Sequence, residues 1–491
     1  MHSSLITLPL LALLLFVGSQ AQNLHICNTH CDNRDASEVS DGARVVATST
    51  INGREIRLII SDTDNMGFAI IINGTARDEV WLDRSFDAGL SWENGSLLGF
   101  TTIPQGVNYA TTTMFNVDYD AVKGLGALRA CGRGLDPSPG PLTCTEWARS
   151  NVHSETRIDA AATALMQYFN GQLWHTVGWW NGANVLTALI QYMKFTDSRT
   201  HFHVIETAYT ENLDGWDGNF TSDALDDTEW WALAWIDAYD VTGNQTYLAM
   251  AQFDADYIYQ YVDSVCGGGV WWSTARTYKN AITNELYIQL AAALHNRIPG
   301  DTKYLAQAIE IWEWFKQSGM INEESLINDG LRDDCTSNRD TTWTYNQGVI
   351  LGALVELYRA TNDSTYLSEA TTIADAVLQS PILTRNGVLT EPCEYSGQVG
   401  CGDHTGGCDC NQIAFKGIFL RHLGELNRNL GSNGQGPYQA YLNRQADTTY
   451  ASNRNILNQY GIHFAGPLED INASTQQSGL EAFTATLFPR F

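Results

Sequence analysis

From about residue 154 onward the apolar positions repeat with a helical period, in two kinds of helix that alternate along the chain. Helices of the first kind carry one apolar stripe, as at Leu305, Ala308, Ile309, Trp312 and Phe315. Helices of the second kind are apolar nearly all round, over residues 179–193, 226–239, 281–294 and 348–358. A striped helix packs by one face, whereas an all-round apolar helix is buried. The alternation therefore predicts two concentric rings of about twelve helices, an all-α (α/α)6 toroid, with an open helical solenoid as the alternative.

An internal repeat supports this architecture. Related nine-residue stretches begin at Gly243, Gly300 and Asn362, and they read GNQTYLAMA, GDTKYLAQA and NDSTYLSEA. Each combines a turn, a helix N-cap and the opening of a helix. Loops that join buried inner helices would converge on one face of the toroid, where a cleft can form.

Before residue 150 the period changes to that of β-strands. Residues 44–49, 55–61, 68–72 and 80–83 form short strand-like runs, and Asn52-Gly53 and Asn73-Gly74 are hairpin-type dipeptides. Residues 85–92 resemble one Asp-box turn, a structural feature of propellers that occurs only once in this chain. A Gly/Pro-rich stretch at 132–141 marks a boundary. We therefore expect a small, disulfide-stapled β-rich domain over residues 22–148, a β-sandwich with an accessory role, and a catalytic domain over residues 149–491.

The N-terminus and the cysteines indicate a secreted protein. Residues 5–17 are apolar and Ser19-Gln20-Ala21 fits a cleavage site, which predicts a signal peptide over residues 1–21. No later stretch is long enough to span a membrane. Ten cysteines, four before residue 150 and six after it, fit disulfides in an oxidising compartment. Glycosylation sequons occur at six positions: Asn73, Asn94, Asn219, Asn244, Asn362 and Asn472.

Two acidic or cysteine-rich stretches raise the question of a metal. Cys401, Asp403, His404, Cys408 and Cys410 are metal-ligand types, but their spacing matches no standard zinc pattern, and we expect disulfides there. Asp62 and Asp64 depart from the spacing of a calcium loop. The sequence therefore predicts no metal site.

The charge balance narrows the possible partners. A formal net charge of -27 disfavours nucleic acid, anionic membranes and acidic polysaccharides. A neutral polysaccharide is compatible with it, although solubility alone could also account for the acidity. We expect a monomer.

The clearest candidate for chemistry is the pair Asp226-Asp227, which opens an aromatic-rich, buried helix. Amide groups and the helix dipole favour ionised carboxylate at a helix start, and a carboxylate at the mouth of a buried helix is costly without a use. The alternative is an N-cap with an acidic first turn. A second pair, Asp333-Asp334, lies in a loop-like stretch and ranks below the first.

Polar and aromatic residues cluster at the other predicted helix starts. Aromatic rings can support the apolar faces of sugars, and amide and ammonium groups can bind hydroxyls. Any single Trp is more often a core residue, but the clustering favours a sugar site. The expected substrate-binding residues are Trp180, Asn184, Lys279, Asn280, Trp343, Tyr345, Asn346 and Gln347.

Several ordered motifs together resemble glycoside hydrolase family 76, the endo-α-1,6-mannanases and their fungal relatives that act on cell-wall mannan. The motifs are LDDTEWWALA from Leu225, GGVWW from Gly268, KNA from Lys279, WTYNQG from Trp343 and FKG from Phe415. The resemblance covers about residues 150–490. It implies an (α/α)6 fold, a retaining mechanism without cofactor, Asp226 as nucleophile and Asp227 as general acid/base.

The leading hypothesis is therefore a secreted endo-acting hydrolase of α-1,6-mannan. A transglycosylase that moves a mannan or GPI-glycan chain, a catalytically silent glycan-binding protein and a toroidal enzyme for another α-glycan remain alternatives. Retention needs two carboxyl groups about 5–5.5 Å apart, which adjacent residues at a helix start can reach.

Overall fold

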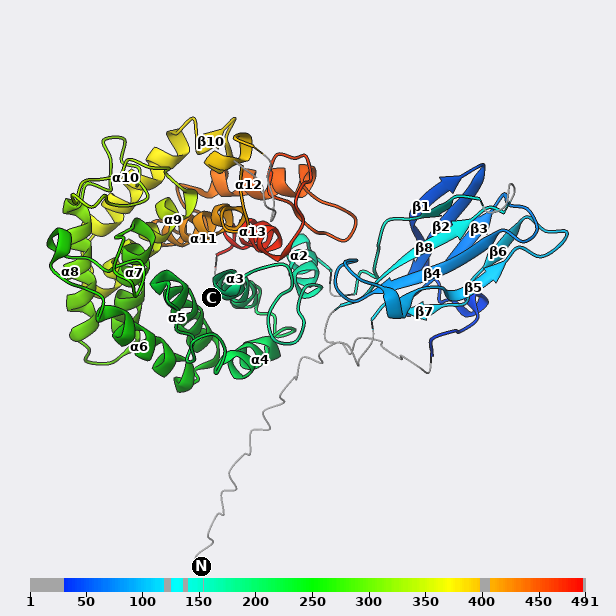
Figure 1. The fold of residues 1–491 in the computed structure, drawn as a ribbon, viewed down its shortest axis with the longest axis horizontal. Helices are drawn as coiled ribbons and strands as arrows, with labels where there is room; N and C mark the ends of the chain where they lie inside the picture. The colour runs from blue at the N-terminus through cyan, green and yellow to red at the C-terminus, as the bar shows by residue number, and fades with distance from the viewer. Residues whose placement is uncertain (1–30, 119–124, 136–139, 153, 398–406, 489–491) are drawn as a thin grey trace, which may run out of the picture.

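The computed structural model describes residues 31–118, 125–135, 140–152, 154–397 and 407–488. Figure 1 shows a β-rich N-terminal part, drawn in blue and cyan, and a helical part that contains the rest of the chain. The predicted signal peptide, Cys27, Cys401, Asp403 and His404 lie outside the described residues. Among the residues described, no helix is long and apolar enough to cross a membrane.

The N-terminal part consists of two antiparallel sheets. One sheet has the order β1-β2-β3-β6, with β7 also paired to β3, and the other has the order β5-β4-β8-β9. Their strands are β1 (Arg44–Ile51), β2 (Arg54–Ser61), β3 (Met66–Ile72), β4 (Glu79–Ser85), β5 (Leu98–Thr102), β6 (Tyr109–Thr111), β7 (Phe115–Asn116), β8 (Ala127–Arg133) and β9 (Leu142–Cys144). Alternate residues of β2 are buried, and Ile56 and Leu58 share one apolar core with Leu82 and Leu128 of the second sheet. The alternating pattern thus produces a two-sheet packing.

The two predicted hairpin dipeptides behave differently. Asn52 and Gly53 both have positive φ (47° and 80°) and join β1 directly to β2, as a two-residue hairpin turn requires. Asn73-Gly74 follows β3, but the next strand, β4, pairs with β5 and β8 in the other sheet. The prediction of a second hairpin at Asn73-Gly74 was therefore wrong, because this turn carries the chain from one sheet to the other.

Twelve α-helices follow among the described residues after 154. They are α2 (Arg157–Met166), α3 (Trp179–Thr196), α4 (His203–Asn212), α5 (Leu225–Thr242), α6 (Gln245–Tyr259), α7 (Ala281–Arg297), α8 (Lys303–Gln317), α9 (Thr344–Thr361), α10 (Thr365–Gln379), α11 (Phe415–Leu430), α12 (Gln439–Ser452) and α13 (Ala473–Thr484). A short hairpin of β10 (Thr384–Arg385) and β11 (Val388–Leu389) follows α10.

The odd-numbered helices from α3 to α13 form a closed inner ring. Each contacts the next, and α13 packs against α3. The even-numbered helices lie outside them (Figure 1). The inner helices α3, α5, α7 and α9 are buried over most of their residues, whereas α8 and α10 bury one stripe, as the apolar pattern predicted. The three sequence repeats open the outer helices α6, α8 and α10.

The first turns of the inner helices meet at one end of the ring. Each inner helix is followed by an outer helix that returns the chain, so successive inner helices point the same way. Their N-terminal ends then share one mouth of the ring, and their C-terminal ends share the other. This geometry gathers loop residues that lie far apart in the sequence.

The β-rich part keeps its contacts up to residue 151. Arg149 forms a buried ion pair with Asp118 (3.1 Å), and Ser150 Oγ donates to Asn65 Oδ1 (2.5 Å). The first helix, α2, begins six residues later, behind a capping box formed by Thr156.

Candidate active site

Asp226 and Asp227 lie in the first turn of α5, on the inner ring. The N-cap residue, Ala224, forms no side-chain cap, and Thr228 Oγ1 accepts a hydrogen bond from the Ser222 amide (2.9 Å). The alternative interpretation, an N-cap aspartate with an acidic first turn, holds only in its second part: both aspartates lie in the first turn, but neither is the N-cap residue. Asp226 Oδ1 is buried and has no hydrogen-bond partner among the described residues. A buried carboxyl oxygen without a partner lowers the free energy of unfolding, and such a cost is expected mainly where the group serves a function.

Burial governs the ionisation of the pair. Burial raises the pKa of Asp226 to about 7, and hydrogen bonds from Trp272 and from nearby amides lower it only in part. Burial, followed by the charge of Asp226, raises the pKa of Asp227 to about 8. Two carboxyl groups this close do not ionise together easily, so the pair holds a proton near neutral pH. One carboxylate and one carboxylic acid are then present side by side.

Two further carboxyl groups, those of Asp329 and Glu229, lie near the pair, and a third, that of Glu285, lies near Asp329; the sequence analysis missed all three. Asp329, in the loop before α9, accepts a hydrogen bond from the Tyr278 hydroxyl (2.5 Å), and its charge contributes to the raised pKa of Asp226. Glu229 lies three residues beyond Asp226 on α5, and Glu285 lies in α7. Both are fully buried, and in the described chain neither carboxyl group has a hydrogen-bond partner. Burial raises the pKa of each well above its usual value and so favours the neutral acid form of both.

Helix α9 adds a hydroxyl and an amide to this cluster. Burial raises the pKa of Tyr345 well above its usual value, and the charges of Asp329, Asp226 and Glu285 raise it further, so its hydroxyl lies near all three. Asn346 is fully buried, and neither polar atom of its amide has a partner among the described residues. The starts of α5 and α9 and the loop before α9 thus converge on one polar cluster. Several of its buried polar atoms have no partner among the described residues, which calls for an explanation.

An aromatic wall stands beside the polar cluster, centred on Phe415 at the start of α11. Tyr345 stacks face to face on Phe415 (3.7 Å between ring centroids), and Trp343 approaches it edge-on (5.9 Å). Trp180, from the start of α3, lies 6.2 Å from Phe415 and stacks on Trp230 (5.8 Å). Three of the expected sugar-binding residues, Trp180, Trp343 and Tyr345, are therefore brought together. Such a wall can support the apolar face of a sugar.

Three other expected sugar-binding residues direct their polar atoms into the protein. Asn184 Oδ1 accepts from the Arg421 guanidinium (2.8 Å). Gln347 exchanges two hydrogen bonds with the backbone of Ile327 (2.8 and 2.9 Å), and Asn280 is the N-cap of α7. Their placement gives them a role in holding the ring and its loops, and it does not support direct contact with a ligand.

Lys279 is likewise engaged inside the protein. Its Nζ donates to Asp263 Oδ1 (3.0 Å) and to the carbonyl groups of Val265 (2.7 Å), Gly268 (2.6 Å) and Gly269 (3.1 Å). Only 2% of the residue is exposed. The ammonium group therefore fixes the glycine loop that precedes two tryptophans, one of which hydrogen-bonds Asp226.

The glycine loop is held from two further sides. A Cβ at Gly269 would lie 2.3 Å from the Trp314 ring, so only glycine permits this approach, as the sequence indicated. The disulfide Cys266–Cys335 joins the loop to the segment that follows Asp329. The loop and the segment carrying Asp329 are thus covalently coupled beside the cluster.

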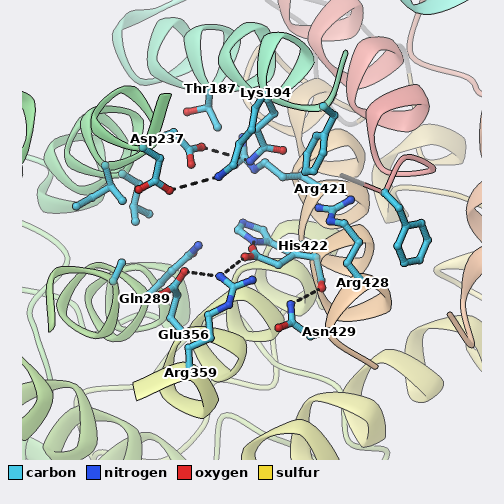
Figure 2. A pocket seen from close by; sticks show the side chains of 18 of the residues that line it. Thr187, Lys194, Asp237, Gln289, Glu356, Arg359, Arg421, His422, Arg428 and Asn429 are labelled. Carbon is cyan, nitrogen blue, oxygen red and sulfur yellow. Dashed lines mark hydrogen bonds and ion pairs between the residues drawn. The ribbon is translucent and has the colours of Figure 1, made fainter. Parts of the chain in front are cut away.

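A cavity of about 800 Å³ lies at the opposite mouth of the ring (Figure 2). It is lined mainly by the C-terminal parts of α3, α5, α7, α9 and α11, and it reaches along α5 as far as Trp230, which stacks on Trp180 of the aromatic wall. Neither Asp226 nor Asp227 lines it.

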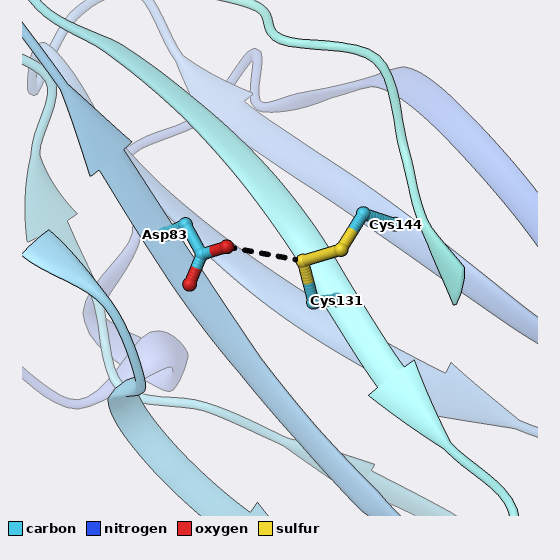
Figure 3. Close-up of side chains that lie close together, drawn as sticks. All are labelled: Asp83, Cys131 and Cys144. Atoms are coloured by element: carbon cyan, nitrogen blue, oxygen red, sulfur yellow. Dashed lines mark hydrogen bonds between the residues drawn. A yellow bond between two sulfur atoms is a disulfide. The ribbon is translucent and has the colours of Figure 1, made fainter. Parts of the chain in front are cut away.

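One group of potential metal ligands is accounted for by a disulfide. Asp83 Oδ2 lies 3.4 Å from Cys131 Sγ, and Cys144 completes the group (Figure 3). Cys131 and Cys144 are joined to each other, so neither sulfur is a thiolate. Cys408, from the cysteine-rich stretch, is paired with Cys393 in the same way. These pairs confirm disulfides within each of the two cysteine groups.

Comparison with known proteins places the helical part in a family. The profile of glycosyl hydrolase family 76 matches residues 154–490. The mannan endo-1,6-α-mannosidase DFG5 of Saccharomyces cerevisiae is 29% identical over 297 residues, which cover 54% of this chain and 63% of that relative. The chain thus spans slightly less than two thirds of the length of this relative.

Solved structures of family 76 enzymes are also similar to the helical part of this chain. The GH76A α-1,6-mannanase from Salegentibacter sp. HEL1_6 is 26% identical with a TM-score of 0.59, over 67% of this chain and 98% of that one. An inactive variant of that enzyme, with two consecutive aspartates replaced by alanine and in complex with α-1,6-mannotetrose, is 25% identical with a TM-score of 0.58 over the same shares. Because the family profile extends over the whole helical part, from before α2 to beyond α13, this chain belongs to glycosyl hydrolase family 76.

Proposed function

We propose that the protein is a secreted, retaining, endo-acting glycoside hydrolase that cleaves α-1,6-mannosidic linkages in mannan. The observation that carries the proposal is the partly exposed pair Asp226-Asp227, in which neither residue is the N-cap of α5 and which holds a proton near neutral pH. A related α-1,6-mannanase is inactive when two consecutive aspartates are replaced, and its complex contains an α-1,6-linked mannan fragment. Both findings support the same site.

The two aspartates would divide the work of a double displacement. Ionised Asp226 attacks the anomeric carbon and forms a glycosyl-enzyme, while protonated Asp227 donates its proton to the leaving glycosidic oxygen. Asp227, now a carboxylate, accepts a proton from the water that attacks the intermediate, which restores both groups. Hydrogen bonds from Trp272 and from nearby amides stabilise the ionised form of Asp226, which favours Asp227 as the acid. This scheme needs no cofactor.

The surrounding residues fit a sugar ligand. Asn346 and Asp329 offer an amide and a carboxyl group to hydroxyls, and the aromatic wall around Phe415 offers an apolar face. Burial favours the neutral form of Glu229 and of Glu285, which limits the negative charge that would oppose ionisation of Asp226. We propose that the latter two tune the pair without touching the sugar.

The same proposal extends to the architecture. The closed inner ring and the surrounding outer helices support an (α/α)6 toroid over residues 149–491, and the two-sheet part over residues 22–148 would be an accessory domain. We propose that the enzyme acts as a monomer on a neutral polymer, for which the net charge of -27 is no obstacle.

Incubation with linear α-1,6-mannan tests the proposal. Product sizes followed by chromatography should show short oligosaccharides, and NMR should show the α-anomer first. If a short acceptor instead yields lengthened chains without hydrolysis, the protein is a transglycosylase. Binding without any product would identify a silent glycan-binding protein, and the hydrolase proposal would be wrong.

Substitutions at the pair test the residue assignment. Asp226→Asn and Asp227→Asn should each abolish turnover while the melting temperature stays at or above that of the wild type. Asp334→Asn is the matched control, since Asp334 is exposed and belongs to the other adjacent pair. Turnover at the wild-type rate in either variant of the first pair would refute the assignment.

A further inference from the structure

The cavity at the C-terminal mouth of the inner ring is a second candidate binding site. Its volume of about 800 Å³ lies within the usual range for small-molecule sites, about 300–1,000 Å³. Figure 2 shows side chains from five inner helices arranged around it. Most of its lining lies toward the C-terminal ends of these helices, and neither Asp226 nor Asp227 is part of it, so the proposed reaction leaves it without a role.

Most charges around the cavity neutralise one another in a continuous chain of ion pairs. The chain runs Lys194–Asp240 (3.3 Å), Asp240–Arg297 (2.7 Å), Arg297–Glu356 (3.4 Å), Glu356–Arg359 (2.7 Å) and Arg359–Glu425 (2.7 Å). It links the C-terminal halves of α3, α5, α7, α9 and α11, and alternating signs leave little net field. Because the negative ends of helix dipoles also meet at this mouth, a free anion gains little there.

The polar side chains of the lining outside this chain of ion pairs include five with few or no polar partners among the described residues. Arg428 has no ion-pair partner in the described part of the protein, and its one hydrogen bond goes to a backbone carbonyl (3.2 Å). Asp237 accepts one hydrogen bond from a glutamine (3.3 Å) and lies within the same lining as Thr187. His422 and Gln289 lie deeper: both ring nitrogens of His422 and the Oε1 of Gln289 are buried without hydrogen-bond partners among the residues described.

His422 is suited to a neutral partner. It is 3% exposed, its nearest carboxylate oxygen is 4.0 Å away, and burial lowers its pKa to about 3. A neutral imidazole has one donor and one acceptor. A Cβ at Gly352 would lie 2.3 Å from His422 Nδ1 and 2.9 Å from Gln289 Nε2, so the glycine leaves room for both side chains.

We propose that this cavity binds a neutral polyhydroxylated molecule of the size of a short oligosaccharide. Hydroxyl groups both donate and accept hydrogen bonds, and the five side chains offer both functions: Arg428 donates, Asp237 accepts, and Thr187, His422 and Gln289 do either. The charges of Arg428 and Asp237 are opposite, which again favours a ligand without net charge. The site is independent of the catalytic pair, so the proposal stands apart from the proposed reaction.

Calorimetric titration of the full-length Asp226→Asn/Asp227→Asn variant with α-1,6-mannotriose tests the proposal. Two sites per chain are expected, one at each mouth. Adding Arg428→Met should weaken one site about tenfold or more, the effect of losing a hydrogen bond to a charged group, and leave the other unchanged. The matched control is Arg199→Met, because Arg199 also lies over a phenylalanine ring (4.7 Å, against 4.3 Å for Arg428) but outside the cavity.

A second cavity variant, hydrogen exchange and a phosphate titration distinguish the possible outcomes. Thr187→Val removes one cavity hydroxyl with little change of shape and should weaken the same site if Arg428→Met fails to fold. On addition of α-1,6-mannotriose, hydrogen exchange should slow at residues 187–195 and 421–430. These residues report on the cavity, whereas residues 225–230 report on the catalytic site, so a failure to bind at one site is distinguished from a failure at the other. Titration that is unaffected by both cavity variants would overturn the proposal. Arg428-dependent binding of inorganic phosphate without binding of the sugar would equally overturn it, since the cavity would then be an anion site.

Discussion

Replacing Lys279 by methionine distinguishes two possible roles of this residue, holding the glycine loop and binding the substrate directly. Methionine keeps much of the length of the side chain but removes an ammonium group that donates to one carboxylate and three carbonyl groups at 2.6–3.1 Å. Each hydrogen bond to a charged group contributes about 1.5–3 kcal/mol, but the loop can relax and admit water, so the losses do not add. We expect a net loss of about 3–5 kcal/mol, as for other broken buried pairs.

This loss should be visible in both stability and turnover. A shift of about 2 °C or more per kcal/mol predicts that the melting temperature falls by about 6–10 °C in calorimetry. Because the loop held by Lys279 leads into Trp272, which hydrogen-bonds Asp226, kcat on α-1,6-mannan should also fall. Lys316→Met is the control: this lysine pairs with Glu313 (2.8 Å) on a partly exposed surface, so its removal should change the melting temperature by about 1–2 °C at most.

A different combination of results would refute this reasoning. If Lys279→Met leaves the melting temperature and kcat unchanged but raises KM, the ammonium group binds the substrate directly. The four internal hydrogen bonds would then be dispensable, and the loop would be held by the disulfide and by packing alone.

Three further predictions concern the site and its surroundings. Burial raises the pKa of Asp227 to about 8, so between about pH 4 and pH 8 Asp227 is ionised in the unfolded chain but protonated in the folded protein. Rising pH therefore lowers the free energy of unfolding in this window. The melting temperature of Asp227→Asn should therefore exceed that of the wild type by more at pH 8 than at pH 4; calorimetry showing the reverse order would contradict the raised pKa. Replacing Cys266 and Cys335 together by serine should reduce activity and speed limited proteolysis of residues 262–277, and unchanged values would show that the disulfide does not hold the loop. Deleting residues 22–148 should leave activity on short oligosaccharides, whereas a folded but inert remainder would mean that the β-rich part completes the active site.

The helical fold could be predicted because its physical cause is local. Helices α5 and α7 are apolar on nearly every side, and α8 has one apolar stripe, so burial on all sides or on one side is encoded in each helix. The pair Asp226-Asp227 was identified by the same reasoning, as charge at the mouth of a buried helix. Asn73-Gly74 shows the limit: a dipeptide specifies a turn, but the pairing of the following strand depends on residues far away.

The sequence could not show which polar residues line the site or where their side chains point. Residues such as Asn184, Lys279 and Gln347 were placed correctly near helix starts, but sequence does not tell which way a polar side chain points. Asp329 sits in an irregular loop and has no local signal. Glu229 did have one, since a carboxyl group inside an otherwise apolar helix is unfavourable to bury and calls for a reason.

The two mouths of the ring differ because all inner helices point the same way. Their N-terminal ends carry partial positive charge, which stabilises an ionised Asp226 against the effect of burial. Their C-terminal ends carry partial negative charge, and Lys194, Arg297, Arg359 and Arg428 lie in the last turns there. The aspartates at one mouth and the basic residues at the other are thus two consequences of a single helix direction. Because the helices themselves account for the positive charge at the second mouth, a ligand there is supported by the unpartnered polar atoms of His422 and Gln289 and by the hydrogen-bond donors of Arg428, and not by net charge.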